Sequence, residues 1–204
     1  MRQKMSHICL EAVSMTDFVN DPRPMFVRAL DQVQQLVDTV DPDDLDLPTP
    51  CPEYDVRDLQ GHLLSVVGRI NLALTGGNAL DIPSITSTTD VMGTWKERRA
   101  RLDLTLADDA VLHQTCNLPW GTLPGAAAIA AYTGELTTHS WDLAKTTSHL
   151  DRLDDDLATY LLPLVQQFIP AEPRGGQVPF GPVVPVADDA SPYDRLAAWQ
   201  GRQP

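Results

Sequence analysis

Apolar residues recur at three- and four-residue steps in five stretches of the chain. This spacing places the apolar side chains on one face of a helix. The five stretches are 25–40, 56–74, 89–106, 126–147 and 153–168. A short β-prone part of 111–123, interrupted by proline and glycine, predicts a loop or small hairpin. The chain is therefore predicted to be all-α, a bundle of about four main helices with an additional C-terminal helix.

Helix-breaking residues separate these stretches. Pro42 ends the first one, three prolines hold 47–54 extended, and Gly76-Gly77 ends the second. Asp55 stands where it can cap the second helix. The residues after 168 are rich in proline and glycine, so we expect a proline-rich tail there.

The first 20 residues lack the continuous apolar core of a signal peptide, because His7, Glu11 and Asp17 interrupt it. No stretch of the chain approaches the roughly 20 apolar residues of a membrane-spanning helix. The composition shifts at Pro22 and Pro24, so we expect residues 1–20 to be a disordered extension, and the chain length fits one domain over residues 21–204.

The chain carries a net charge of −13, from 15 basic and 28 acidic residues. Such a charge repels phosphate backbones and anionic lipid headgroups, which argues against nucleic acid or a membrane as partner and favours a small ligand. The third helix holds a basic cluster that we interpret as a solvated face. Its members are Lys96, Arg98, Arg99 and Arg101. The cysteines are few, odd in number and widely spaced, as expected of free thiols in a reducing cytoplasm.

One carboxylate stands apart from the other acidic residues. Glu135 is the only charged residue between Ala110 and Trp141, and it lies in the middle of a predicted helix. A bare carboxylate in such surroundings is costly to desolvate, so it needs a cation, a metal, a proton or an opening to water. His139 lies one helical turn further on the same face.

A third candidate ligand comes from the second helix. His62 borders its apolar stripe, inside the uncharged segment 59–68. Two histidines and one carboxylate, here His62, Glu135 and His139, form a three-ligand set that leaves metal positions open, as in catalytic sites. From these ligand types alone, zinc, iron, nickel and manganese fit about equally.

Each of these residues also has an interpretation without a metal. Glu and His four residues apart commonly form a surface pair or a partly buried hydrogen bond, and a lone histidine beside an apolar stripe is commonly a hydrogen-bonded core residue. Asp142 either packs and caps, or accepts a hydrogen bond from His139 and orients its ring. Cys51, between two prolines, is interpreted as a small buried side chain in a turn. The remaining histidines are interpreted as non-ligands: His7, His113 and His149.

At these positions the sequence resembles a known group. The motifs are TPCPEYDVRDL at 49–59 with His62-Leu63, then Glu135-Leu136 leading to HSWDLA at 139–144. They resemble the DinB-like metalloprotein superfamily, and within it the actinobacterial branch related to the N-terminal domain of mycothiol-dependent maleylpyruvate isomerase. The resemblance covers roughly residues 24–204, including the glycine- and proline-containing end of the chain.

The resemblance implies a four-helix bundle that holds a divalent metal, usually zinc or nickel, on the residues matching His62, Glu135 and His139. It also implies that the metal activates a low-molecular-weight thiol, such as mycothiol or bacillithiol, for isomerase or S-transferase chemistry on an electrophilic substrate. Two features depart from the family. The isomerase has a second α/β domain where this chain has a short tail, so maleylpyruvate isomerisation itself is not expected. Tyr54 stands where relatives often have tryptophan, which leaves metal binding untouched.

Three hypotheses follow. The first is a cytoplasmic metal-dependent enzyme of the thiol-transferase or isomerase type, with zinc as the expected ion and mycothiol as co-substrate. The second is a non-catalytic bundle that binds a metal or small ligand for regulation or partner binding. The third is a metal-free helical protein, in which Glu135 pairs with an arginine such as Arg69. A homodimer is a further expectation, because related bundles commonly dimerise.

Overall fold

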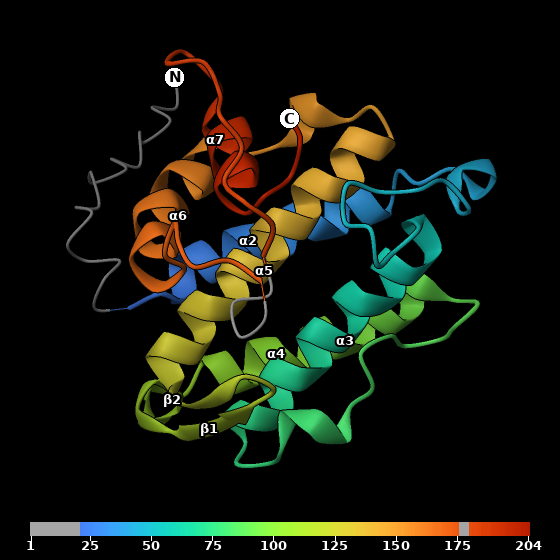
Figure 1. Ribbon diagram of the computed structural model, residues 1–204. Helices are drawn as coiled ribbons and strands as arrows, with labels where there is room; N and C mark the ends of the chain where they lie inside the picture. Colours follow the sequence, from blue (N-terminus) through green and yellow to red (C-terminus); the bar gives the residue numbers. More distant parts are fainter. Residues whose placement is uncertain (1–20, 176–179) are drawn as a thin grey trace, which may run out of the picture.

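The computed structural model describes residues 21–175 and 180–204. The extension expected over residues 1–20 lies outside the described residues. Within the described part, the structure is mostly helical, with one two-stranded antiparallel sheet (Figure 1). The helices are α2 (Arg23–Val37), α3 (Val56–Leu74), α4 (Val91–Leu106), α5 (Gly125–Thr146), α6 (Asp155–Phe168) and α7 (Pro192–Trp199). The strands are β1 (Thr115–Leu118) and β2 (Gly121–Pro124). The predicted all-α fold and the small hairpin are both confirmed.

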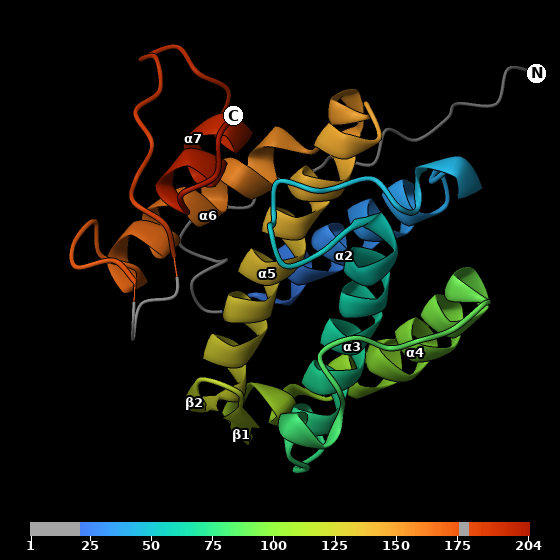
Figure 2. The same cartoon turned by 45° about the vertical axis from the view of Figure 1, so that its right-hand side comes forward.

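Helix α5 is the centre of the bundle. It packs against α2 on one side and α3 on another, and α4 packs on α3 (Figure 2). The apolar stripes of these four helices meet in one core, which holds Phe26, Leu63, Trp95 and Trp141 with almost no exposure. No helix among the described residues is both long enough and apolar enough to cross a membrane.

Aspartates define where several helices begin. The Asp55 carboxylate accepts a hydrogen bond from the Asp58 backbone N–H at 2.8 Å, so the predicted cap of α3 is confirmed. Asp90 and Asp154 cap α4 and α6 in the same way. Each cap satisfies a backbone N–H that the helix itself leaves unpaired.

The predicted proline-rich tail contains a helix that the sequence pattern did not reveal. Ser191 caps α7 by accepting from the Asp194 backbone N–H, and α7 packs on α6 and α5. The eight residues of this helix are too few to establish a periodic pattern by themselves. The serine–proline start, typical of a helix N-terminus, was the available signal.

The prediction that the basic residues of α4 form a solvated face is correct in part. Lys96 and Arg101 are exposed, but Arg98 and Arg99 are half-buried. Arg98 donates to the Leu64 backbone oxygen, and Arg99 forms ion pairs with Asp31 and Asp103. Long arginine stems lie along apolar surface while their heads reach polar partners, which a helical pattern of charges does not show.

A buried amide ties α2 to the C-terminal half of the chain. The Gln32 amide nitrogen donates to the Tyr193 hydroxyl at 2.9 Å, and its oxygen accepts from the Asp154 backbone N–H at 2.6 Å. We expect Gln32→Ala to lower the free energy of unfolding by about 1–3 kcal/mol, because it leaves buried polar groups unpaired. Gln35→Ala, at an exposed position of the same helix, is the control and is expected to change it by about 0.5 kcal/mol or less. Urea unfolding measures both, and equal values would contradict the role of the amide.

Candidate metal centre

Helices α3 and α5 bring together the three side chains singled out as candidate ligands. His62 Nε2 lies 3.1 Å from Glu135 Oε1, and His139 Nε2 lies 3.7 Å from the same oxygen. The two imidazole rings have their centroids 4.9 Å apart. One ligand atom from each of the three residues lies within 4.8 Å of the others. Residues 73 positions apart in the chain, His62 and Glu135, thus face one another across the helix pair.

Hydrogen bonds behind the imidazoles determine which ring nitrogens face Glu135. His62 Nδ1 lies 3.0 Å from the Ser84 backbone oxygen, and His139 Nδ1 lies 2.9 Å from Asp142 Oδ2. Both oxygens can only accept, so each Nδ1 carries the hydrogen. In the neutral rings, each Nε2 then presents a lone pair towards the Glu135 carboxylate. The lone pairs of the two Nε2 atoms and of the Glu135 carboxylate then face one another. Such an arrangement requires a proton or a metal cation between them.

The pKa values of the cluster reflect this arrangement. Burial alone raises the pKa of Glu135, but interactions with His139 and His62 outweigh it and hold the pKa well below its usual value. Burial likewise lowers the pKa of His139, whereas interactions with Asp142 and Glu135 raise it to about 9. Without a metal, the cluster is therefore an imidazolium–carboxylate group. A divalent cation would replace the proton between the same atoms.

Glu135 forms the solvent-accessible edge of the cluster. Its side chain is 35% exposed, while those of His62 and His139 are each 7% exposed. Tyr54 stacks on His62, with ring centroids 4.8 Å apart and an interplanar angle of 25°. Burial and nearby negative charges raise the pKa of Tyr54 to about 12, so its hydroxyl stays protonated at neutral pH. Glu135 is thus the most exposed of the three side chains, and the histidines are shielded.

The segment between α2 and α3 places Tyr54 and Cys51 at the cluster. The Thr49 hydroxyl donates to the Tyr54 backbone oxygen at 2.7 Å and accepts from the Cys51 backbone N–H at 3.2 Å. Figure 2 shows this segment passing beside α5 before it enters α3. A surface hollow of about 200 Å³ lies against the segment and includes Cys51 and Tyr54 in its lining. The Cys51 thiol is buried, as predicted, and burial is the main cause that raises its pKa.

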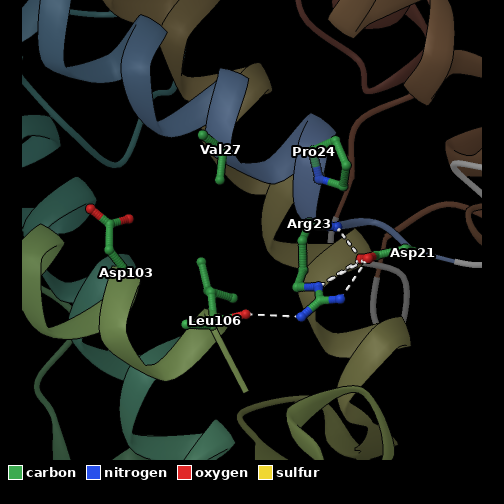
Figure 3. Close-up of a pocket in the computed structure, with 7 residues that line it drawn as sticks. Asp21, Arg23, Pro24, Val27, Asp103 and Leu106 are labelled. Carbon is green, nitrogen blue, oxygen red and sulfur yellow. Dashed lines mark hydrogen bonds and ion pairs between the residues drawn. The ribbon is translucent and has the colours of Figure 1, made fainter. Parts of the chain in front are cut away.

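A second surface hollow, of about 430 Å³, lies between the start of α2 and the end of α4, and none of the three clustered residues lines it (Figure 3). Its cationic group, Arg23, is already bonded to Asp21, Asp109 and the Leu106 backbone oxygen. Asp103, which also lines this hollow, is paired with Arg99, so the charged groups found in its lining among the described residues all have partners.

Asp142 lies within hydrogen-bond distance of His139, so its role in orienting that ring stays a prediction that the geometry allows. It is fully buried and accepts from His139. The sequence analysis missed its second partner, Arg202, which contacts Asp142 Oδ1 at 2.6 Å and Oδ2 at 2.8 Å. A buried aspartate in the middle of a helix signals a need for a cation, but nothing local pointed to an arginine 60 residues later.

Two further predictions concern the partner of Glu135 and the remaining histidines. Arg69 donates from Nε to the Ile82 backbone oxygen, and within the described ranges the ion-pair partners of Glu135 are the two histidines. The pairing of Glu135 with Arg69 is therefore wrong. His113 and His149 belong to neither of the two groups of described residues that could hold a metal ion, and His7 lies outside the described residues.

Comparison with known proteins identifies the family of the chain. The family model for the mycothiol maleylpyruvate isomerase N-terminal domain matches residues 26–144. The chain belongs to this family. The matched region of this family member contains the three clustered residues on α3 and α5, and ends before the tail that carries Arg202.

Relatives of this family member include two uncharacterised proteins of Mycobacterium tuberculosis, from strains CDC 1551 and H37Rv. Each is 29% identical over 182 residues, which covers 89% of this chain and 98% of the relative. A crystal structure of the mycothiol-dependent maleylpyruvate isomerase matches with a TM-score of 0.56 and 12% identity, over 77% of this chain and 71% of that one. A histidine-to-alanine mutant of that enzyme matches with a TM-score of 0.57 and 10% identity, over 80% and 74% of the two chains. At these identities, the structural matches establish a shared fold.

Proposed function

We propose that this protein holds a divalent metal ion on His62, Glu135 and His139 and uses it to activate a small thiol of the mycothiol type. The observation that carries the proposal is that Nε2 of His62 and Nε2 of His139 both face Glu135 Oε1, while each Nδ1 is held by an oxygen on the other side of its ring. Two nitrogens and one oxygen suit zinc, our first choice, and nickel, and they leave a coordination position for a ligand. Membership of a family named for a mycothiol-dependent enzyme supports the choice of thiol.

A bound divalent ion supplies one chemical function: it lowers the pKa of a coordinated thiol, so that a thiolate nucleophile is available at neutral pH. The chain's own residues would orient the ligands and control access. Ser84 and Asp142 hold the imidazoles, Tyr54 covers His62, and the exposed edge of Glu135 marks the side of entry. The reaction class that we propose is S-transfer or isomerisation of an electrophilic substrate by a domain spanning residues 21–204, acting in the cytoplasm.

Calorimetric titration with mycothiol tests the thiol part of the proposal. We expect the zinc-loaded protein to bind one thiol per chain and the metal-free protein to bind at least about tenfold more weakly, because the thiolate loses its cation. S-methyl mycothiol, whose sulfur cannot ionise, is the matched control ligand and is expected to bind about as weakly as mycothiol binds the metal-free protein.

The outcomes of this titration separate the hypotheses. Equal affinity for mycothiol and its S-methyl form would contradict contact between the sulfur and the ion. Zinc binding without any thiol affinity would instead favour the non-catalytic metal-binding bundle.

A further inference from the structure

His139 belongs to two sets of side chains that could hold a metal ion. One is His62, Glu135 and His139, and the other is Cys51, His139 and Asp142, with one ligand atom per residue within 4.8 Å of the others in each set. All three members of the second set are buried. Thiolate, imidazole and carboxylate are all zinc ligands, so the second set is chemically competent as well.

The two sets need different forms of the same imidazole. Towards Glu135, His139 presents Nε2, whereas towards Asp142 it presents Nδ1. A neutral imidazole carries its hydrogen on one nitrogen and a lone pair on the other. The ring can therefore serve one set or the other, but not both at once. A group that keeps the hydrogen on Nδ1 of His139 therefore favours binding of the ion at His62 and Glu135.

Arg202 is placed to make this assignment. Its guanidinium contacts both oxygens of Asp142, and its side chain is only 12% exposed. A two-pronged arginine contact of this kind is strong and fixes the plane of the carboxylate. It keeps Asp142 as a charged acceptor for Nδ1–H of His139. It also places a positive charge on Asp142 and close enough to Cys51 to interact with it electrostatically, which disfavours a second cation at that pair.

The end of α7 directs Arg202 towards α5. Gly201 adopts a φ of +84°, its N–H bonds to the Ala198 oxygen at 3.0 Å, and the Arg202 N–H bonds to the Ala197 oxygen at 3.0 Å. This pair of bonds is a Schellman ending, which a glycine in the left-handed region makes possible. A Cβ at Gly201 would overlap the Gly181 backbone, so the turn also fits closely against the preceding tail. The placement of Arg202 is therefore built into the fold.

We propose that Arg202 is a positioning residue that selects between the two donor sets, holding Asp142 on His139 so that the ion binds at His62 and Glu135 and not at Cys51. This inference rests on the proposed metal-binding function. It adds a specific role for the C-terminal tail, which lies outside the region that the family model matches.

Cobalt(II) is a suitable probe, because a cobalt–thiolate bond gives a near-ultraviolet charge-transfer band that nitrogen and oxygen ligands do not give. We expect the wild-type protein to bind cobalt without this band. We expect Arg202→Met to bind cobalt at least about tenfold more weakly at the original site, as for other losses of ligand-orienting groups, and to show the thiolate band. Combining Arg202→Met with Cys51→Ser should abolish the band.

Two further variants control for general effects on the tail. Arg195→Met removes an exposed arginine of α7 and should leave cobalt affinity and spectrum as in the wild type. Arg202→Gln keeps a donor to Asp142 but removes the charge, so it tests the same role with the packing better preserved, and we expect it to show the band too. The midpoint of thermal unfolding is measured for each variant.

The possible results are distinct. If Arg202→Met and Arg202→Gln bind cobalt with wild-type affinity and without a thiolate band, the role of Arg202 is overturned while the metal site stands. If the wild-type protein itself takes up no cobalt, the proposed metal function fails.

Discussion

Glu135→Gln is expected to lower the affinity for zinc at least about 100-fold, because loss of a ligand should exceed the roughly 10- to 100-fold cost of losing a group that only orients one. The amide has nearly the size of the carboxylate but no negative charge. Its NH2 group can also donate to the Nε2 lone pairs of His62 and His139, which occupies the atoms that would bind the ion. Titration with a competing chromophoric chelator measures the affinity.

Glu97→Gln is the matched control for this substitution. Glu97 lies on α4 with its side chain 62% exposed and forms an ion pair with Arg101 one turn away. We expect wild-type zinc affinity for Glu97→Gln, because the three candidate ligands are unchanged. Loss of such an exposed ion pair also has little effect on the stability of the fold. Wild-type affinity in the Glu135→Gln protein would show that the carboxylate is not a ligand.

Gly125→Ala is expected to lower the free energy of unfolding by about 3 kcal/mol, at the upper end of the usual cost of overpacking. Gly125 begins α5 directly against the backbone of the preceding 3-10 turn (Asp109–His113), and a Cβ there would overlap the Val111 carbonyl oxygen. Backbone atoms cannot rotate away as a flexible side chain can. The first turn of α5 would have to shift, disturbing the central helix of the bundle.

In the same helix, Gly134→Ala is expected to change the free energy of unfolding in the opposite direction. The nearest atom to its added Cβ is Leu161 Cδ2 at 3.9 Å, an ordinary contact. Because glycine is unfavourable inside a helix, this substitution should raise the free energy of unfolding by about 0.5–1 kcal/mol. Denaturant unfolding compares the two variants. A similar change in both would contradict the close approach at Gly125.

Local patterns were sufficient to predict most of the fold and part of the candidate site. Helices α2 to α6 follow apolar stripes of three or more turns, and the cap at Asp55 follows from one residue type at one position. The pair Glu135 and His139 needed only helical spacing and the absence of other charges around it. The choice of His62 required more, because its position relative to α5 depends on how two helices pack.

The parts that sequence analysis missed depend on contacts between distant segments. Arg202 reaches Asp142 from a tail whose course is determined by the packing of α7 on α6 and α5. Ser84 contributes a backbone oxygen, which no side-chain pattern can reveal. Arg98 was interpreted as solvated because charge alone does not show that a guanidinium finds buried backbone acceptors. Each of these three errors concerns a polar partner; the one helix that was missed, α7, is too short to show a periodic pattern.

The most direct test is the metal content and coordination of the wild-type protein, purified without chelators, supplied with zinc and dialysed. Elemental analysis is expected to find about one zinc per chain, and X-ray absorption to find nitrogen and oxygen ligands without sulfur, as the donor set His62, Glu135 and His139 requires. Less than about one-tenth of an equivalent of zinc, or sulfur in the coordination shell when no small thiol has been added, would contradict a metal centre at these three residues.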